Sequence, residues 1–318
     1  MSVATYPDTP SARDRWVLDR REPAQPHDPW TPVGFFVEGE RAHSGEVVPV
    51  ATVLLTNREC PFRCAMCDLW QQMLADTVPS GAILAQLDYA LARLPPTRQV
   101  KLYNAGSFFD PRAIPQHDLS ALAKRLRNFE RVIVECHPAF LGDECTQFAG
   151  RLEGKLEVAI GLETAHPETL DRLNKRMTLE QFERAAEFLA QREITLRVFV
   201  LVRPPFLPAE HAAEWTQRSA EFAFECGAMA VSLIPTRPGN GALEALREQG
   251  LYSPPHLSEL EAAHAAAIAP DRGRVFADTW DLERFSDCPA CFPARLNRLR
   301  TMNEEQSVLP PIRCPACG

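Results

Sequence analysis

The stretch that decides the fold reads Thr56-Asn-Arg-Glu-Cys60-Pro-Phe-Arg-Cys64-Ala-Met-Cys67, directly after a short apolar run at residues 50–56. Its three cysteines, four and three positions apart, can direct their thiolates at one centre. Iron–sulfur clusters are held by closely spaced cysteine thiolates, usually four of them, so three would leave one iron without a protein ligand. A three-cysteine zinc site and three buried structural thiols are the alternatives that the spacing leaves open.

The chain has 318 residues, and its ten cysteines are unevenly placed. Three are in this first motif, four lie near the end at positions 288, 291, 314 and 317, and three are scattered at 136, 145 and 226. The N-terminal residues lack the basic-then-apolar order of a secretory signal, so we expect a cytoplasmic protein with reduced thiols. In that setting clustered cysteines indicate metal sooner than disulfides, and the scattered three are expected to pack in the core.

Composition places the chain among ordinary globular proteins, with 45% hydrophobic and 24% charged residues. The 34 Lys and Arg against 42 Asp and Glu give a net charge of −8. This balance argues against a protein that mainly coats nucleic acid or an anionic membrane. No run of about 18 apolar residues is present, so we expect no membrane span.

Outward from the first motif, short apolar runs alternate with amphipathic helical stretches, the pattern of a parallel sheet with right-handed crossovers. The strand candidates are residues 50–56, 100–103, 131–135, 156–162, 195–202 and 230–234, and the helical stretches are 82–94, 119–128, 167–173, 179–192 and 210–226. We expect a Pro-rich extension at 1–45, loosely ordered over residues 6–32, then a core at 46–270 and a small module at 271–318. An open doubly wound sheet and a partial barrel both fit this order.

The faces of the strands favour the barrel. Each of the strands at 131–135, 156–162 and 195–202 has one apolar face and one mixed polar face, which suits a wet, curved lumen. Glu135, His137, Arg197 and Arg203 are therefore candidates for substrate or cofactor contact. An ion pair inside the barrel, or a hydrogen-bonded histidine, is the alternative role for each.

The Cys-x3-Cys-x2-Cys motif after the first strand of a six-fold βα pattern resembles the radical S-adenosylmethionine (radical SAM) superfamily. The resemblance implies a partial (β/α)6 TIM-like barrel in which Cys60, Cys64 and Cys67 hold a [4Fe–4S] cluster. It also implies S-adenosylmethionine on the open iron, reductive cleavage to a 5′-deoxyadenosyl radical, and a low-potential electron donor of the flavodoxin or ferredoxin type. Many relatives have an aromatic residue before the third cysteine; here Met66 stands there and can pack on adenine.

Further positions resemble the elongator-type and coproporphyrinogen-dehydrogenase-like branch. The turn Asn104-Ala-Gly106-Ser107 stands where relatives bind the cofactor's amino group through backbone carbonyls, although it lacks their Gly-Gly-Glu. Glu163 matches a residue that meets the ribose, and Lys175, twelve positions on, matches one that meets the carboxylate. An ordinary turn, a buried ion pair and a solvated helix start are the alternative readings of these three features.

A narrower resemblance is to the radical SAM subunit of archaeosine synthase, which acts on a lysine-modified deazaguanine base in tRNA. The matching segments are Gly161-Leu-Glu-Thr, Asn174-Lys175, Leu201-Val-Arg203-Pro-Pro-Phe-Leu207 and Tyr252-Ser-Pro-Pro255. Family kinship does not transfer a substrate, so the expected substrate is either a small molecule or a tRNA base.

The second cysteine motif is a pair of Cys-x2-Cys units, Cys288 with Cys291 and Cys314 with Cys317, separated by 22 residues. Four thiolates suit structural Zn²⁺, and they also suit a rubredoxin-like iron or a second iron–sulfur centre. A segment this short needs such a metal, because it cannot hold a core unaided. Two non-catalytic functions remain as alternatives to a radical SAM enzyme: a metal-cluster electron carrier and a zinc-containing RNA-binding protein.

Overall fold

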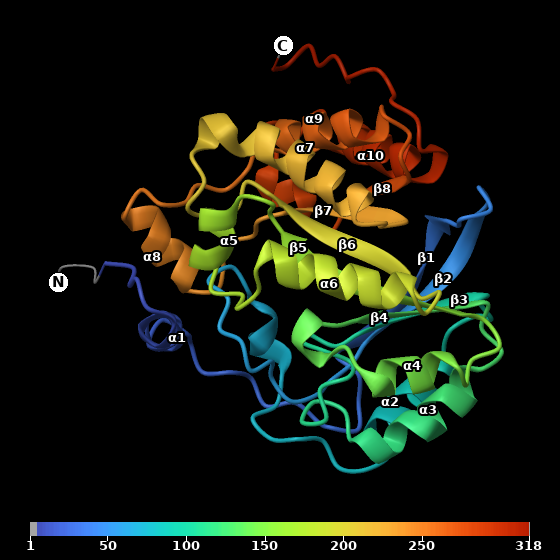
Figure 1. Ribbon diagram of the computed structural model, residues 1–318. Helices are drawn as coiled ribbons and strands as arrows, with labels where there is room; N and C mark the ends of the chain where they lie inside the picture. The colour runs from blue at the N-terminus through green and yellow to red at the C-terminus, as the bar shows by residue number, and fades with distance from the viewer. Residues whose placement is uncertain (1–4, 318) are drawn as a thin grey trace.

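The computed structural model describes residues 5–317, and their main feature is one curled, eight-stranded sheet in the order β1 to β8 (Figure 1). β1 runs antiparallel to β2, and every later neighbour pair is parallel. The strands are β1 (Gly34–Arg41), β2 (Val47–Leu54), β3 (Gln99–Tyr103), β4 (Arg131–Glu135), β5 (Lys155–Glu163), β6 (Thr195–Val202), β7 (Ala230–Pro235) and β8 (Arg274–Ala277). None of the described helices is long and apolar enough to cross a membrane.

A layer of helices covers the convex face of this half-barrel, and others lie at its end or across its open side (Figure 1). The described α-helices are α1 (Pro10–Leu18), α2 (Ala82–Leu91), α3 (Leu119–Leu126), α4 (Asp143–Ala149), α5 (Pro167–Arg172), α6 (Leu179–Ala190), α7 (Ala209–Glu225), α8 (Ala242–Glu248), α9 (Leu257–Ile268) and α10 (Phe292–Glu305). α6 shows why such segments are helical. Thr178 and Gln181 form a capping box at its start, and its apolar residues recur at helical spacing and are buried against the sheet.

Strand alternation separates a dry outer layer from a polar lumen, as the sequence predicts. On β6, Leu196, Val198 and Val200 are buried in the core beneath the helices. The intervening Arg197 and Phe199 face the lumen and line a cavity there. The predicted partial barrel is therefore confirmed, with β2 to β7 corresponding to the six strands expected from the sequence.

Two edge strands were not expected. β1 lies within the segment 1–45, and β8 extends the same sheet although it lies beyond position 270. The expectation of a loosely ordered arm over residues 6–32 is wrong for residues 10–18, and residues 34–41 of the extension form a strand of the main sheet. Pro10 begins α1, whose Trp16 and Val17 pack in a small apolar cluster with α8, and β1 has eight residues paired with β2.

α10 spans the gap between the two edges of the half-barrel. Arg41 of β1 donates from Nη1 to the carbonyl oxygen of Glu304 (2.9 Å). On the other edge, the side chain of Asn303 bonds both N–H (2.8 Å) and C=O (2.9 Å) of Ala277, at the end of β8. The helix thus joins β1 to β8 where the sheet itself does not close.

A buried ionic network lies on the lumen side and ties β1 to the middle of the sheet. Arg197 contacts Glu40 of β1 (2.5 Å) and Glu157 of β5 (2.6 Å), and Lys101 of β3 contacts Glu40 (2.5 Å). All four side chains are at least nine-tenths buried. The cations lower the pKa of Glu40 and Glu157 despite burial, which by itself raises them, so both carboxylates are charged and need their partners.

Arg197→Met tests this network. The variant leaves Glu40 and Glu157 buried with fewer partners, and breaking a buried pair in this way costs about 3–5 kcal/mol. We expect a loss of that order in the free energy of unfolding, measured by urea denaturation. Arg98→Met, which removes the exposed ion pair between Arg98 and Glu130, is the matched control and should leave the urea midpoint unchanged. Equal midpoints for the two variants would contradict the role of the network.

Candidate functional site

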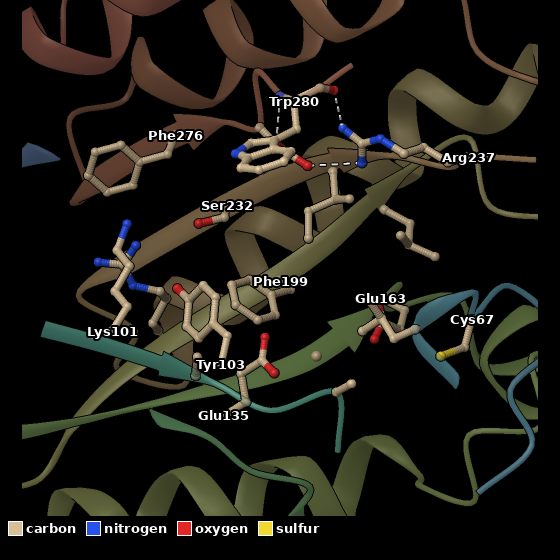
Figure 2. A pocket seen from close by; sticks show the side chains of 18 of the residues that line it. Cys67, Lys101, Tyr103, Glu135, Glu163, Phe199, Ser232, Arg237, Phe276 and Trp280 are labelled. Carbon is tan, nitrogen blue, oxygen red and sulfur yellow. Dashed lines mark hydrogen bonds and ion pairs between the residues drawn. The ribbon is translucent and has the colours of Figure 1, made fainter. Parts of the chain in front are cut away.

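The lumen holds a cavity of about 520 Å³ that runs from the cysteine loop, residues 57–68, to the buried ionic network. Figure 2 shows Cys67 and Glu163 at one end and Lys101 at the other, with Tyr103, Glu135 and Phe199 between them. Cys60, Cys64 and Cys67 all line this cavity. The carboxyl ends of the parallel strands converge here, which is where sites form in barrels of this kind.

Backbone contacts from distant segments hold the cysteine loop. Asn174 donates from Nδ2 to the carbonyl oxygen of Arg63 (2.8 Å), and Asn240 donates to those of Ala65 (2.8 Å) and Cys67 (3.2 Å). Sequence reasoning gave neither asparagine a role. The position of Asn174 next to Lys175 was the one available signal, and its φ of 61° lies in the left-handed region that asparagine tolerates.

The three loop thiols are partly or fully withdrawn from water. Cys64 is buried, and Cys60 and Cys67 are half-buried. Burial raises the pKa of Cys64 to about 12 and also raises that of Cys60 and Cys67, so as thiolates they would need positive metal ions beside them. Within residues 5–317, the one set of three or more His, Cys, Asp or Glu side chains that converges on an ion-sized point is the C-terminal one.

The turn after β3 lies against the cysteine loop. A Cβ atom on Gly106 would sit 3.5 Å from Cβ of Cys60, so this turn forms the wall beside that ligand. Asn104 donates its backbone N–H to Glu135 of β4 (3.2 Å), and its buried side-chain atoms have no partner among the described residues. Ser107 accepts a hydrogen bond from the backbone N–H of His137 (2.9 Å) and does not line the cavity.

Glu163 and Lys175 meet in the cavity as an ion pair of 2.7 Å. Sequence reasoning gave them separate ligand contacts with this pair as the alternative, and in the protein alone they bind each other. Glu163 has a φ of 67°, just beyond a register shift in β5. The pair lies over Gly161, because a Cβ atom there would collide with Oε1 of Glu163 and lie 2.7 Å from Nζ of Lys175.

His137 positions the Lys175 segment. Its Nδ1 accepts from the N–H of Ala139 (3.1 Å), so Nε2 is the donor to the carbonyl oxygen of Lys175 (3.0 Å). Burial, with Lys175 nearby, lowers the pKa of His137 to about 3 and keeps the ring neutral. The ring packs on Phe62 of the cysteine loop at 4.1 Å between centroids, so His137 links that loop to Lys175.

The other residues predicted to contact the substrate or the cofactor have different surroundings. Met66 lines the cavity, as the adenine contact would require. Arg197 belongs to the buried ionic network, and Arg203 is paired with Glu259 of α9 (2.7 Å). Sequence reasoning missed Trp280, an exposed residue at the cavity wall just after β8.

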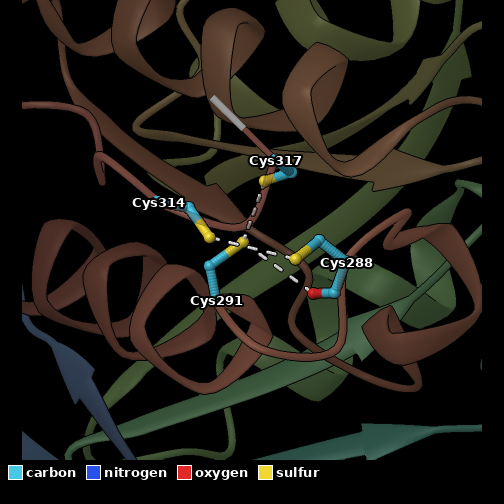
Figure 3. Close-up of side chains that lie close together, drawn as sticks. All are labelled: Cys288, Cys291, Cys314 and Cys317. Carbon is cyan, nitrogen blue, oxygen red and sulfur yellow. Dashed lines mark hydrogen bonds between the residues drawn. The ribbon is translucent and has the colours of Figure 1, made fainter.

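The four C-terminal cysteines form a second site, separate from the cavity (Figure 3). Their sulfur atoms lie within 4.8 Å of one another, with 3.9 Å between Cys288 and Cys314 and 3.8 Å between Cys291 and Cys317. The first three side chains are buried and Cys317 is exposed. Cys291 is also the N-cap residue of α10, so this group fixes the start of the helix that spans the half-barrel.

Comparisons with known proteins agree with this geometry. No family model matches the chain. Archaeosine synthase subunit beta from Methanosarcina acetivorans is 28% identical over 83% of this chain and 81% of its own length. Methylornithine synthase shares the fold with a TM-score of 0.52 and 13% identity, over 79% of this chain and 68% of that one.

A further solved structure is the radical S-adenosylmethionine methyltransferase TsrM from Kitasatospora setae. It is 17% identical over 61% of this chain, and this chain spans 38% of its length, with a TM-score of 0.45. The half-barrel fold is shared with methylornithine synthase, and the three-cysteine motif that follows β2 is similar to that of radical SAM proteins.

The residues of this site fit a [4Fe–4S] cluster and S-adenosylmethionine. The cluster would meet the three thiols of the cysteine loop, and the cofactor would meet a cation at Lys175 with its carboxylate and the carboxylate of Glu163 with its ribose. The unpartnered side-chain amide of Asn104 lies in the adjoining turn. The cavity of about 520 Å³ is of ligand-binding size.

Gly161→Ala tests whether the ion pair over Gly161 serves the cofactor. The added methyl group displaces Glu163 and Lys175 without removing either charge, so we expect S-adenosylmethionine to bind the anaerobically reconstituted protein about tenfold more weakly in equilibrium dialysis. Gly150→Ala is the control, since Gly150 has a φ of −66° and a Cβ atom there would make only ordinary contacts of 3.5 Å or more. Unchanged affinity in the Gly161 variant would show that the pair takes no part in binding.

Proposed function

We propose that the chain is a radical SAM enzyme that starts radical chemistry on a substrate held in the lumen. The observation that carries this proposal is that the three thiols of the cysteine loop, the Glu163–Lys175 pair and Gly106 of the turn after β3 all line one cavity. When bound, the cluster would supply one electron from the external donor and S-adenosylmethionine would supply the carbon-centred radical that abstracts a hydrogen atom from the substrate, with methionine as the other product.

The protein residues bind and orient the groups. Lys175 neutralises the cofactor's carboxylate, and the carboxylate of Glu163 accepts hydrogen bonds from the ribose hydroxyls. When the ligand binds, the ion pair between Glu163 and Lys175 is replaced by contacts of each side chain with the ligand. The carbonyl groups of the turn at residues 104–107 accept from the amino group. The apolar wall keeps water from the reacting atoms.

A flat, modified base is the substrate class that the cavity favours. Phe199 and Tyr103 lie in its wall with 6.0 Å between ring centroids, and Trp280 stands at its exposed rim beside Phe36 (5.2 Å). Aromatic rings suit a base taken out of a stack. The similarity to archaeosine synthase subunit beta supports a tRNA base within this class, and a free small molecule is the alternative.

The electron donor would approach from outside the cysteine loop. A polar hollow there is lined by Arg58, Arg63 and Arg112 along with Glu59, Pro61 and Ala75. Three guanidinium groups beside Cys60 and Cys64 suit an acidic protein of the flavodoxin or ferredoxin type.

Cofactor cleavage is the decisive measurement. With dithionite as reductant, anaerobically reconstituted protein should convert S-adenosylmethionine to 5′-deoxyadenosine and methionine, detected by chromatography. Cys64→Ser removes a cluster ligand and should reduce this product at least a hundredfold, whereas Cys226→Ser, outside the cavity, should retain it.

The rival functions give different results in the same assay. Protein that binds the cofactor and never yields 5′-deoxyadenosine would be an electron carrier, and salt-sensitive RNA binding that survives Cys64→Ser without cleavage would indicate an RNA-binding protein. Added tRNA that raises the yield supports the base substrate.

For the C-terminal group we propose one tetrahedral Zn²⁺. Metal–sulfur bonds of about 2.3 Å in a tetrahedron place the sulfur atoms about 3.8 Å apart, which matches the observed 3.8 and 3.9 Å. A four-iron cluster binds each cysteine at a different iron and holds the sulfur atoms farther apart. A rubredoxin-like iron shares the tetrahedral geometry and is separated from zinc by metal analysis.

Cys314→Ser should remove one equivalent of zinc per chain and leave the iron content unchanged, as measured by plasma emission spectrometry. Cys291 is the N-cap residue of α10, and this helix is hydrogen-bonded to the edge strand β8. We therefore also expect faster amide hydrogen exchange in β8, residues 274–277. Cys64→Ser is the reciprocal control, which loses iron and keeps zinc. Iron lost from the Cys314 variant would overturn the assignment.

A further inference from the structure

Glu135 differs from the other carboxylates that line the cavity. Glu163 is paired with Lys175 (2.7 Å) and Glu40 with Lys101 (2.5 Å). Glu38 and Asp278 are likewise paired, with Lys101 and Arg237. Across residues 5–317, no Lys, Arg or His lies within ion-pair distance of Glu135. Asp68 shares this property, but it adjoins Cys67, where a metal would decide its charge.

The carboxylate of Glu135 is held by the turn after β3 and faces the cavity. Its Oε2 accepts from the backbone N–H of Asn104 (3.2 Å), and the backbone N–H of Ala105 also stabilises the carboxylate, so both donors come from one neutral turn. Figure 2 shows the carboxylate beside Tyr103, on the cavity side of β4. Burial raises the pKa of Glu135 to about 7, so a charged partner is missing from this surface.

We propose that Glu135 binds a cationic amino group of a ligand held in the cavity. An ammonium ion would supply the missing charge and donate to the carboxylate from the cavity side. Two sources have this chemistry: the α-amino group of S-adenosylmethionine and an amine on the substrate. The inference rests on the proposed function insofar as it takes the cavity as the ligand site.

The neighbours of Glu135 match a zwitterion. Lys175 acts electrostatically on Glu135, as does Glu163, so one cation and one unpaired carboxylate face the same end of the cavity. An amino-acid group placed there meets Lys175 with its carboxylate and Glu135 with its ammonium group. Residues 104–107 of the turn after β3 include no acidic residue. The hydrogen bond from Asn104 places the carboxylate of Glu135, from the neighbouring strand β4, beside this turn.

Glu135→Gln tests the proposal because the amide oxygen still accepts from Asn104 while the negative charge is lost. Equilibrium dialysis with the reconstituted full chain would use S-adenosylmethionine and its analogue in which hydrogen replaces the α-amino group. If the cofactor is the source, we expect S-adenosylmethionine to bind at least tenfold more weakly to the variant and the analogue to bind equally to both proteins.

If the substrate is the source, S-adenosylmethionine binds both proteins equally, and 1,5-diaminopentane binds the cofactor-loaded variant at least tenfold more weakly than the loaded wild type. Glu135→Asp, which keeps the charge, should recover part of either loss. Glu130→Gln removes an exposed carboxylate and should change neither affinity. The proposal is overturned if no ligand distinguishes the folded Glu135→Gln protein from the wild type. Failure of cofactor cleavage with these affinity differences intact would count against the proposed function alone.

Discussion

The ion pairs that join Glu40 to Arg197 and Lys101 are the constraint on which the half-barrel depends. A parallel sheet that curls without closing leaves its first strand attached along one edge only. Glu40 draws β1 inward, because its charge is buried and finds its partners on β3 and β6. Removing one partner of a buried pair costs several kcal/mol, whereas the intact network need add little net stability. Its main effect is to make one curvature of the sheet much more favourable than the others.

Features that arise from local sequence patterns could be predicted, whereas the two edge strands of the curved sheet could not. The cysteine motif, the six central strands and the lumen faces follow from local spacing and alternation, and they were predicted. β1 was missed because Glu38 and Glu40 give it a polar inner face in a segment next to Pro-rich sequence. β8 was missed because it has four residues. A strand as short as β8 shows no clear periodicity.

The contacts within the site were harder to predict. Glu163 and Lys175 were predicted to contact the cofactor, and both line the cavity, but their mutual pairing depends on the absent side chain at Gly161 and on the φ of 67° at Glu163. Asn174 and Asn240 hold the cysteine loop by hydrogen bonds to backbone carbonyls more than 100 residues away. No local pattern encodes such a bond, since asparagine is equally common in turns that bind nothing.

The C-terminal cysteines connect a distant part of the chain to the same cavity. Asn303 of α10 lies in the cavity wall and bonds the backbone of Ala277, while the first residue before α10 is Cys291. A metal that fixes Cys291 therefore sets the position of a helix with Asn303 on its last turns. In a closed barrel the sheet would hold β8 in place; here β8 pairs with β7 on one side, and α10 supplies the second support. The four-cysteine group is thus a structural part of the cavity, although none of its sulfur atoms lines it.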